Sequence, residues 1–564
     1  MSLDRCLFLA RTAREDGRAE LERRIERLAA FHGGTASWRF VGRLAAAGAV
    51  RPDGAEETLD APLAFGEPLP PALAGVEALL DASAGELRAL EGTVAALAVG
   101  GERACIAAGA CAPGTLYAAT SGPIDAWSTH AVAASWLALG RARVDSAALP
   151  EQLAAEFVGG ERCLVEGVRA LPQAVRIAVT DDGAELLDFW PLGERWRAVD
   201  EDAAAAHVEE HLLRTLERRA GAAGEPYASL TAGLDSRVVA VALRELGLRP
   251  CTFAWGQPGD GDVRGGADVA AALGLDHTAV EYEWLGDDEA LDAARREARW
   301  SEGAVHVGFA RLAWPEGMPA FVTGAGGELG RAFYYRDRAP DGEDASGEEL
   351  AGALARLLEP RIAGARREAR DALAGSARSW VDAALAAGHS GWRALDVVYG
   401  EQRLRRWLRG MLPRLSAPMV PAFATPEVAR GLVSLPLADR LSDGFHRGFL
   451  ESRAPDLAPP AEPSRAGRPG GLRRAAGRLP GLGRMRRAEP SALAGRWDER
   501  ARFREWVVDG VLASPLVVEP LGERWARRTR DRFLAGDAQA EAHALAAAAP
   551  VALAEELRRL ERDG

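Results

Sequence analysis

The chain has 564 residues, of which 48% are hydrophobic and 27% are charged, and its formal net charge is −13 at pH 7. This length allows two or more domains with a buried core each, and the composition is typical of a soluble globular protein. The negative charge argues against general nucleic-acid binding, which needs a basic face. No hydrophobic run reaches the roughly 18 residues of a membrane span, and the short run near the N-terminus does not predict a signal peptide, so the expected compartment is the cytoplasm.

All 69 basic residues are arginine, because the chain contains no lysine, and it contains no asparagine either. This usage is typical of codon bias in a GC-rich bacterial genome. Its chemical consequence is that no lysine can take part in catalysis, so arginine must supply any fixed positive charge. The five cysteines and nine histidines are scattered without a C-x-x-C pair, and we expect no zinc site from their spacing.

Residues 1–200 are expected to form a mixed α+β domain rich in short strands. Alternating hydrophobic segments predict strands at 104–108, 115–119, 175–180 and 184–189. The turn residues Asp181-Asp182-Gly183 predict a β-hairpin between the last two. The loop 190–201 is expected to connect this domain to the rest of the chain.

From residue 203 onward, strands are expected to alternate with helices. The pattern predicts helices at 203–219, 236–246, 264–273 and 287–300, and strands at 225–230, 250–255, 278–282 and 320–323. Such alternation predicts an α/β domain with a doubly wound parallel sheet. Ligands in sheets of this kind bind at the carboxyl ends of the strands.

The C-terminal part is expected to be mainly helical, at 348–412 and 497–562, and to belong to one domain that spans residues 201–564. The segment 454–495 stands apart because it is rich in Pro, Gly and Arg. That composition predicts a loop, with a short amphipathic helix around 471–478.

The first candidate site is the turn from Thr231 to Ser236, between a predicted strand and a predicted helix. Backbone N–H groups at such a helix start attract phosphate, Gly233 permits a tight turn, and the hydroxyls of Thr231 and Ser236 can donate to phosphate oxygens. Asp235 would repel phosphate but can hold the Mg²⁺ that accompanies a nucleotide. The alternative is an ordinary strand–helix turn with an aspartate cap.

The second candidate site is Val322-Thr323-Gly324-Ala325-Gly326-Gly327-Glu328, again a strand end followed by a glycine-rich turn and an acid. If the two strands are neighbours, Glu328 and Asp235 can share one Mg²⁺, because two carboxylates and phosphate oxygens suit that ion. Alone, this turn is equally compatible with a simple loop.

Segment 228–330 resembles the synthetase domain of the asparagine synthetase family, a branch of the PP-loop ATP pyrophosphatases. The family signature Ser-Gly-Gly-x-Asp-Ser is matched by Thr231-Ala232-Gly233-Leu234-Asp235-Ser236, and the acidic second family motif by the slightly shorter Thr323–Glu328 turn. Weaker matches are found at residues 252–256, at 268–277 with His277, and at 422–428. The resemblance implies that ATP contacts the following residues: Leu230, Thr231, Gly233, Asp235, Ser236, Gly256, Thr323 and Gly324.

The N-terminal half resembles the Ntn-type glutaminase half of that family at residues 86–95 and 116–192, but the catalytic motif is degenerate. The family places a cysteine directly after the initiator Met, whereas this chain has Ser2-Leu3-Asp4, and Cys6 is the nearest thiol. We therefore do not expect glutamine hydrolysis. The family's late lysine, which meets the pyrophosphate, is also absent, and Arg237, Arg331 or the arginines of 465–487 could replace it.

These observations predict an ATP-dependent amide-forming ligase that releases AMP and pyrophosphate, with Asp235, Arg237 and Arg331 as its catalytic residues and ATP and Mg²⁺ as cofactors. A small-molecule or peptide carboxylate would form an acyl-adenylate, and ammonia or an amine of the substrate would displace AMP, as in relatives that close a β-lactam or cyclise a lasso peptide. The substrate pocket is expected between the sheet and helices at 395–410. No nucleic-acid or membrane partner is expected, and oligomerisation is possible.

Three alternatives remain open. One is a catalytically impaired nucleotide-binding or scaffolding relic, because both motifs and the late lysine depart from the family pattern. Another is a glutamine-hydrolysing asparagine synthase. The third is another PP-loop chemistry, such as sulphur transfer or tRNA modification, which is disfavoured by the acidic charge and by the lack of C-x-x-C.

Overall fold

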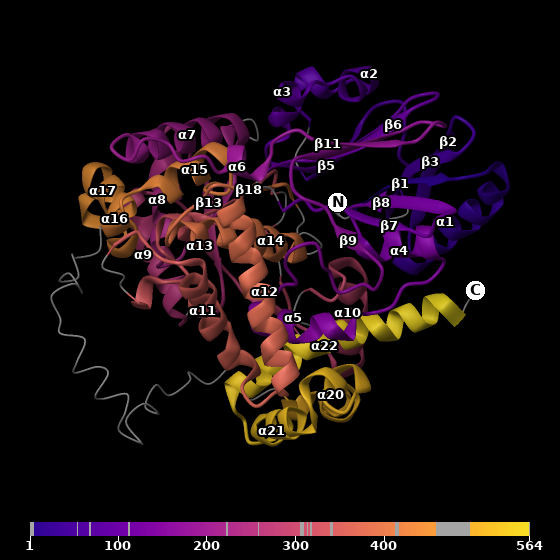
Figure 1. Ribbon diagram of the computed structural model, residues 1–564. Coiled ribbons are helices and arrows are strands. Elements are labelled where there is room, and N and C mark those ends of the chain that lie inside the picture. The colour runs from indigo at the N-terminus through magenta and orange to yellow at the C-terminus, as the bar shows by residue number, and fades with distance from the viewer. Residues whose placement is uncertain are drawn as a thin grey trace.

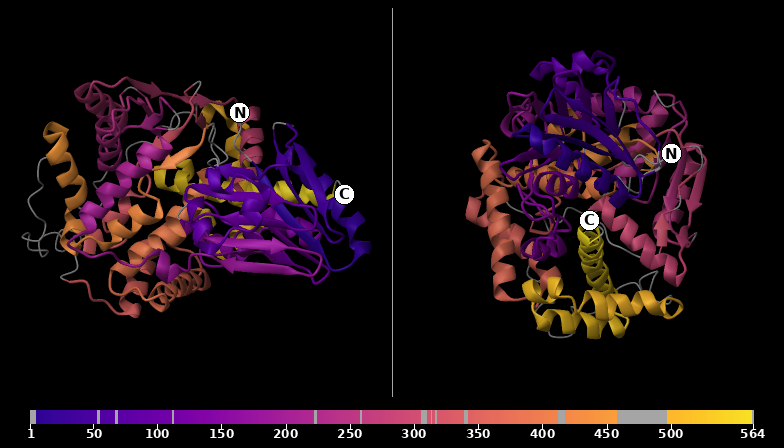
Figure 2. Two further views of the ribbon diagram at one scale, coloured as in Figure 1. Left: turned by 90° about the horizontal axis from the view of Figure 1, so that it is seen from above. Right: turned by 90° about the vertical axis from the view of Figure 1, so that its right-hand side faces the viewer.

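The computed structural model describes residues 5–562, except 53–54, 67–68, 111–112, 222–223, 258, 305–309, 313, 316–317, 339–341, 412–416 and 458–496. It is a mixed α/β structure with one parallel sheet and several antiparallel sheets. The antiparallel sheets of the N-terminal half lie at one end of the molecule and the parallel sheet at the other (Figures 1 and 2). The helix predicted around 471–478 lies outside the described residues.

The N-terminal half contains two antiparallel sheets. The strands of the first are, in order, β2 (Thr35–Val41), β3 (Ala45–Arg51), β1 (Cys6–Thr12), β8 (Ile124–Ser128), β7 (Tyr117–Thr120) and β9 (Arg169–Ala170). Those of the second are β11 (Ala184–Asp188), β10 (Val175–Val179), β6 (Ala104–Ala108), β5 (Thr93–Val99) and β4 (Leu63–Gly66). The predicted hairpin is confirmed, because β10 pairs antiparallel with β11.

The period-two alternation of β1 explains how these sheets are layered. Leu7 and Leu9 belong to a core shared with the second sheet, whereas Cys6, Phe8 and Ala10 belong to a separate core under the helices. Side chains of a strand point alternately to its two faces. The helices over the first sheet are α1 (Arg18–His32) and α4 (Ala131–Leu139), and the second sheet carries the short α2 (Val76–Leu80) and α3 (Ala84–Leu87).

The predicted parallel sheet is confirmed and has five strands. Their order is β14 (His277–Val280), β13 (Cys251–Trp255), β12 (Tyr227–Ser229), β17 (Phe321–Thr323) and β18 (Met419–Pro421). The helices of this region are α7 (Ala204–Arg219), α8 (Leu234–Glu245), α9 (Gly261–Leu273) and α10 (Asp287–Ser301). One predicted strand, 278–282, is wrong in its extent, because the chain leaves the sheet at Glu281 and continues as β15 (Tyr282–Trp284), which pairs antiparallel with β16 (Ala310–Leu312).

The remaining described chain is mostly helical, as predicted. The helices after β17 are α11 (Gly347–Leu358), α12 (Arg367–Ala386), α13 (Arg393–Val398), α14 (Arg405–Met411), α15 (Pro426–Ser434), α16 (Leu437–Ser442) and α17 (Gly444–Arg453). A π-helical segment, Tyr399–Leu404, joins α13 to α14. The C-terminal helices are α19 (Ala501–Glu505), α20 (Pro515–Leu521), α21 (Glu523–Leu534) and α22 (Ala538–Arg562).

The long helix α22 ties the two halves together. It packs along α10 and runs towards the N-terminal sheets (Figure 1), where Leu553 and Leu557 join the core under α1 and α4. Arg27 of α1 donates to the carbonyl oxygen of Leu560 at 2.6 Å. Two antiparallel sheets precede the boundary predicted near residue 200 and the parallel sheet follows it, but α22 packs into the N-terminal core, so the division into two domains stays a prediction.

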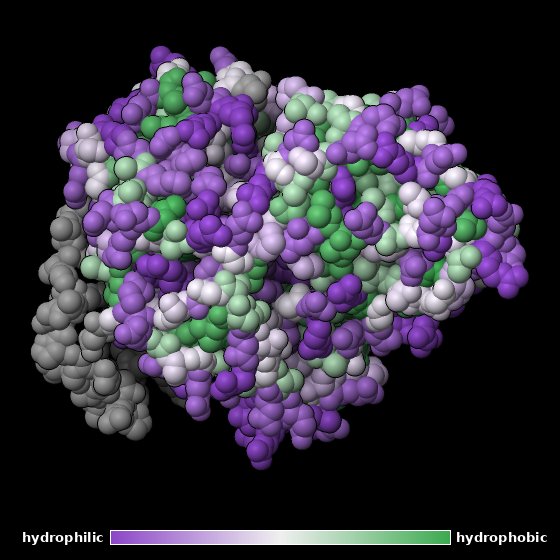
Figure 3. Space-filling model, turned by 45° about the horizontal axis from the view of Figure 1, so that its top comes forward, coloured by the Kyte–Doolittle hydropathy of each residue, from purple (hydrophilic) through white to green (hydrophobic). Residues whose placement is uncertain are grey.

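The described surface is that of a globular protein. On the face shown in Figure 3, hydrophilic residues dominate the left half and the right-hand rim, and hydrophobic residues are more frequent just right of the middle. The most exposed large hydrophobic side chains are scattered over separate elements, as is usual: Leu186, Phe333, Leu357, Trp407 and Leu534. Among the described helices, none is both long enough and apolar enough to cross a membrane.

Candidate functional site

The two predicted turns meet at the point where the strand order of the parallel sheet reverses. β12 pairs in parallel with β17, with Tyr227 opposite Phe321 and Ala228 opposite Val322. From β12 the chain proceeds outward through β13 and β14 and then returns to β17 on the other side. Ligands of open α/β sheets bind at such a switch point, beyond the carboxyl ends of the strands. The expectation that these strands are neighbours is therefore confirmed.

Glycines allow the second turn to press against Asp235. A Cβ atom added to Gly327 would lie 2.2 Å from Asp235 Oδ1, and one added to Gly324 would lie 2.9 Å from Asp235 Cβ. Gly326 has a φ of +96°, and a Cβ there would lie 2.8 Å from the carbonyl carbon of Phe423. A larger residue at any of these positions would collide. Only glycine there allows the turn to fit between Asp235 and the loop after β18.

Two side chains, Arg331 and His446, contact the carboxylate of Asp235. Arg331 Nη1 donates to Asp235 Oδ2 at 3.0 Å, and His446 Nε2 of α17 lies 2.9 Å from Oδ1. Burial alone would raise the pKa of Asp235, but the contact with His446 and the charge of Arg331 outweigh it and lower the pKa. Asp235 is therefore ionised at neutral pH.

Glu328 is the second carboxylate of this edge. Its pKa is raised by burial and by the negative charge of Asp235, against a hydrogen bond from Tyr399 at the start of the π-helical segment. Glu328 Oε2 is buried without a hydrogen-bond partner among the described residues. Asp235 Oδ1 is likewise buried without a hydrogen-bond partner among the described residues, although His446 Nε2 lies 2.9 Å away. Both carboxylates thus keep one buried acceptor oxygen.

Arg331 is shared between two acids. Its Nε donates to Asp443 Oδ1 at 2.8 Å, and Arg336 Nη2 donates to Asp443 Oδ2 at 2.8 Å. Burial would raise the pKa of Asp443, but these two arginines lower it to about 2. Asp443 adopts a left-handed conformation with φ of 62° between α16 and α17. Arg331 is consequently fixed beside Asp235 and is not free to swing far.

The turn before α8 is organised by its own hydroxyls. The N–H of Thr231 donates to Ser236 Oγ at 3.1 Å, and the N–H of Gly233 donates to Thr231 Oγ1 at 3.1 Å. These hydroxyls, which we expected to face phosphate, therefore hold the turn in shape. The N–H groups of the first helical turn, at Leu234 to Ser236, have no acceptor within the helix and can still receive an anion.

Arg237 lies on the outer side of the same turn. Its Nη2 donates to the carbonyl oxygen of Ala232 at 2.7 Å, and its Nη1 donates to the carbonyl oxygen of Leu457 at 3.0 Å. This arginine fastens the turn to the end of the α17 region, so its observed contacts are those of a positioning residue. The arginines of 465–487 lie outside the described residues.

The other predicted nucleotide residues line the same edge of the sheet. The N–H of Leu230 donates to the carbonyl oxygen of Phe253 at 2.8 Å, and the carbonyl oxygen of Thr323 accepts from the N–H of Ala422 at 2.9 Å. Gly256 follows β13 with φ of +142°, and a Cβ there would lie 2.6 Å from Asp260 Oδ2. His277 stands behind the turn, with Nδ1 2.9 Å from Thr252 Oγ1.

Three residues of the site were missed from the sequence: Tyr399, Asp443 and His446. They come from the late helical region, far along the chain, and no local motif marks them. Only the packing of α17 and of the π-helical segment against the sheet edge brings them to Asp235 and Glu328.

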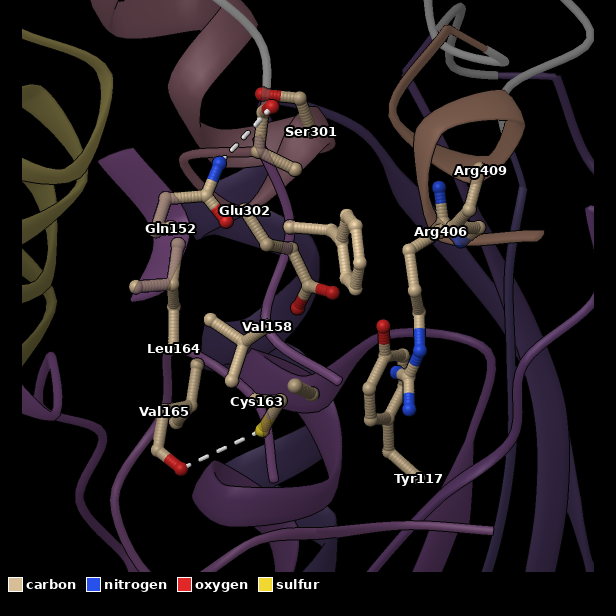
Figure 4. A pocket seen from close by; sticks show the side chains of 13 residues that line it. Tyr117, Gln152, Val158, Cys163, Leu164, Val165, Ser301, Glu302, Arg406 and Arg409 are labelled. Atoms are coloured by element: carbon tan, nitrogen blue, oxygen red, sulfur yellow. Dashed lines mark hydrogen bonds between the residues drawn. The ribbon is translucent and has the colours of Figure 1, made fainter. Parts of the chain in front are cut away.

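A separate cavity lies between the halves (Figure 4). It is lined by Tyr117 and Cys163 of the N-terminal half, by Glu302 after α10, and by Arg406 and Arg409 of α14. The Glu302 carboxylate points inward, and its Oε1 accepts from the N–H of Val132 at the start of α4 at 2.6 Å. One wall is α14, but the other walls do not come from the parallel sheet, so the substrate pocket expected between that sheet and the helices at 395–410 stays a prediction.

The N-terminal half shows no reactive thiol at Cys6. This residue begins β1 and is completely buried, its Sγ lies 3.5 Å from Ser128 Oγ, and burial raises the pKa of its thiol to about 12. A thiol that stays protonated is a poor nucleophile. Ser2, Leu3 and Asp4 lie outside the described residues.

The donor chemistry of the sheet edge suits a hydrated divalent ion and a phosphate chain. Two carboxylates converge there, each with a buried oxygen that has no hydrogen-bond partner among the described residues, and hard oxygen donors are what Mg²⁺ prefers. Arg331 already pairs with Asp235 and His446 contacts it, so an ion would share that carboxylate with them. Neither a protein-family model nor a curated protein matches this chain.

Proposed function

We propose that the protein is an ATP-dependent carbon–nitrogen ligase, which activates a carboxylate as an acyl-adenylate with release of pyrophosphate and then forms an amide. The observation that carries this proposal is the meeting of Asp235 and Glu328 at the switch point, beside the N-terminus of α8. An acidic pair next to unsatisfied backbone N–H groups suits a metal-bound triphosphate better than either feature alone. The fold assignment that goes with it is a PP-loop synthetase domain, residues 201–564, after a degenerate glutaminase-like domain, residues 1–200.

In this proposal the described residues bind and orient the nucleotide. The N–H groups at the start of α8 receive phosphate oxygens, and the Thr231–Ser236 hydrogen bonds keep the turn in one conformation before the nucleotide arrives. Asp235 and Glu328 would hold Mg²⁺, which when bound supplies charge neutralisation for the leaving pyrophosphate. Arg331 fixes the orientation of Asp235, and Arg237 fixes the outer side of the turn.

We propose that the amine arrives as free ammonia or as part of the substrate. The burial and raised pKa of Cys6 support this, because that thiol cannot act as a glutaminase nucleophile. The carboxylate that is activated would belong to a small molecule or a peptide, and the reaction would take place in the cytoplasm. A glutamine-hydrolysing asparagine synthase would need a nucleophile upstream of Cys6.

A second candidate is a nucleotide-binding relic without catalysis. The specific observation in its favour is that Asp235 already pairs with Arg331 and contacts His446, as in a purely structural ion-pair network.

A pyrophosphate-release screen tests the proposal. The purified chain would be incubated with ATP and Mg²⁺ and with aspartate, peptides or sugar carboxylates, with ammonia, with glutamine or with neither. We expect release that depends on one class of carboxylate and that glutamine does not enhance. Nucleotide binding without release for any acid would favour the relic, and release that requires glutamine would favour the glutamine-hydrolysing alternative.

A further inference from the structure

Two histidines lie side by side on α7, away from the candidate nucleotide site. His207 and His211 are one helical turn apart, so their side chains share a face of the helix. Their ring centroids are 4.2 Å apart, with an interplanar angle of 41°. Two imidazoles at this spacing on a helix form one half of many zinc sites.

A third ligand comes from the facing helix. Glu427 lies in the first turn of α15, and its Oε2 is 3.3 Å from His207 Nε2. One ligand atom from each of the three side chains lies within 4.8 Å of the others. Ligand atoms bound tetrahedrally at about 2.0–2.1 Å from zinc are about 3.3 Å apart. His207 Nε2 and Glu427 Oε2 already have this separation, and the same nitrogen lies 3.1 Å from the carbonyl oxygen of Glu427, which an ion would have to replace as its partner.

The packing around the three side chains fixes them in place. A Cβ atom added to Gly431 of α15 would lie 2.6 Å from Val208 Cγ2 and 3.0 Å from His207 Cδ2, so the two helices touch directly beneath the cluster. Arg430 Nη1 donates to both oxygens of Glu427, at 2.8 and 3.0 Å, and its Nε donates to the carbonyl oxygen of Arg197. A ligating carboxylate held by such an outer partner is already oriented for a metal.

The access of the cluster also suits metal binding. The side chains of His207 and Glu427 are 22% and 28% exposed, which leaves a path for an ion and room for water as a fourth ligand. Within the described parts of the chain, this is the one group of three histidine, cysteine or acidic side chains whose ligand atoms converge in this way.

We propose that His207, His211 and Glu427 form a binding site for a divalent transition-metal ion, with zinc as the ion that its donors fit best. Two nitrogens and one carboxylate oxygen match the ligands of zinc, whereas Mg²⁺ and Ca²⁺ prefer oxygen alone. The ion would clamp α7 to α15, the helix that follows β18. The expectation of no zinc site overlooked this pair of histidines, and the acid that would complete the site comes much later in the chain, so spacing alone could not reveal it.

Metal titration of the full chain tests this site without reference to ligase activity. Chelator-treated protein would be titrated with Co²⁺, whose tetrahedral complexes have characteristic visible absorption, and then with Zn²⁺ followed by thermal unfolding. We expect one equivalent to bind, Zn²⁺ to displace Co²⁺, and Zn²⁺ to raise the Tm. His211→Ala and the isosteric Glu427→Gln should each weaken binding at least about 10-fold, since even the loss of an outer-shell partner costs that much.

Glu210→Gln is the matched control, because Glu210 lies on α7 next to the pair and is exposed with Arg214 as its partner. It should bind metal as the parent chain does. Unchanged affinity in both ligand variants, or no tetrahedral Co²⁺ spectrum in the parent chain, would overturn the proposal. Because no nucleotide enters the experiment, its failure would leave the ligase proposal untouched.

Discussion

The two halves of the molecule treat their reactive side chains in opposite ways. In the antiparallel half, Cys6, Cys105 and Cys163 are buried and burial raises the pKa of each thiol. In the parallel half, acids and arginines collect at one edge of the sheet. The reason is topological, since all parallel strands end at the same edge, so that turns distant in sequence meet there, whereas successive antiparallel strands end at opposite edges. Of the three large sheets, the parallel one therefore gathers the acids and arginines of the candidate site at one edge.

Replacing Asp235 by Asn should have the largest effect on activity. The change keeps the shape of the side chain but removes the charge that Arg331 and His446 face and that a metal would need. We expect pyrophosphate release to fall by roughly 10²-fold or more, as when a charge-stabilising group is lost from an active site. Circular dichroism should show that the variant folds. Release at the parent rate would remove the sheet edge from the reaction.

Arg331→Gln should have the next largest effect, and mainly on stability. The change leaves Asp235 and Asp443 partly buried with less compensating charge. Breaking such a pair from one side costs up to about 3–5 kcal/mol when it is fully buried, and the partial exposure of Arg331 reduces our expectation to roughly 2–3 kcal/mol. Urea unfolding measures it. A loss below about 0.5 kcal/mol, as for surface pairs, would show that the network is merely superficial.

Gly327→Ala tests whether the two turns must touch. Its Cβ would lie 2.2 Å from Asp235 Oδ1, so the carboxylate or the turn must move, at a cost of about 1–3 kcal/mol and with a loss of pyrophosphate release. Gly375→Ala is the matched control, because that helical glycine faces open space and alanine there should stabilise α12 by about 1 kcal/mol. Equal activity of the two variants would speak against the close approach.

The loss of folding stability at acid pH should arise mainly in the parallel half. The pKa of Asp443 is lowered to about 2 and that of Asp235 is also lowered. Both contribute stability at pH values above the ordinary aspartate range, near 4, and lose it as the pH falls towards 2. Asp443→Asn should flatten this decline by roughly 1–2 kcal/mol in unfolding measured between pH 5 and 2. An unchanged decline would mean that other carboxylates cause it.

Cys6→Ser should have the smallest effect on activity. The thiol lies within a β-sheet core and contacts Ser128, so its loss should change pyrophosphate release less than about 2-fold while costing about 1 kcal/mol of stability. The measurement is release with ammonia and with glutamine as amine donors. Loss of a glutamine-dependent rate would show that the N-terminal half is catalytically alive.

The sequence predicts the strands and turns of the sheet edge, but not the later residues that pack against them. The strand and helix around Thr231–Ser236 follow from local hydrophobic periodicity, and their neighbour β17 follows from the glycine-rich turn after it. Strand β18, Asp443 and His446 do not follow, because their places depend on how late helices pack rather than on any local pattern. The role expected for the Thr231 and Ser236 hydroxyls also changed, since a short turn can satisfy its own polar groups.

Calorimetric titration with a non-hydrolysable ATP analogue tests the central claim most directly. We expect the parent chain and Gly375→Ala to bind one equivalent in the presence of Mg²⁺ and much less tightly in its absence, and Asp235→Asn to lose affinity at least about 10-fold, that is, about 1.4 kcal/mol. Binding of the analogue to Asp235→Asn with the parent affinity, or no binding to the parent chain, would contradict the assignment of this edge as the nucleotide site.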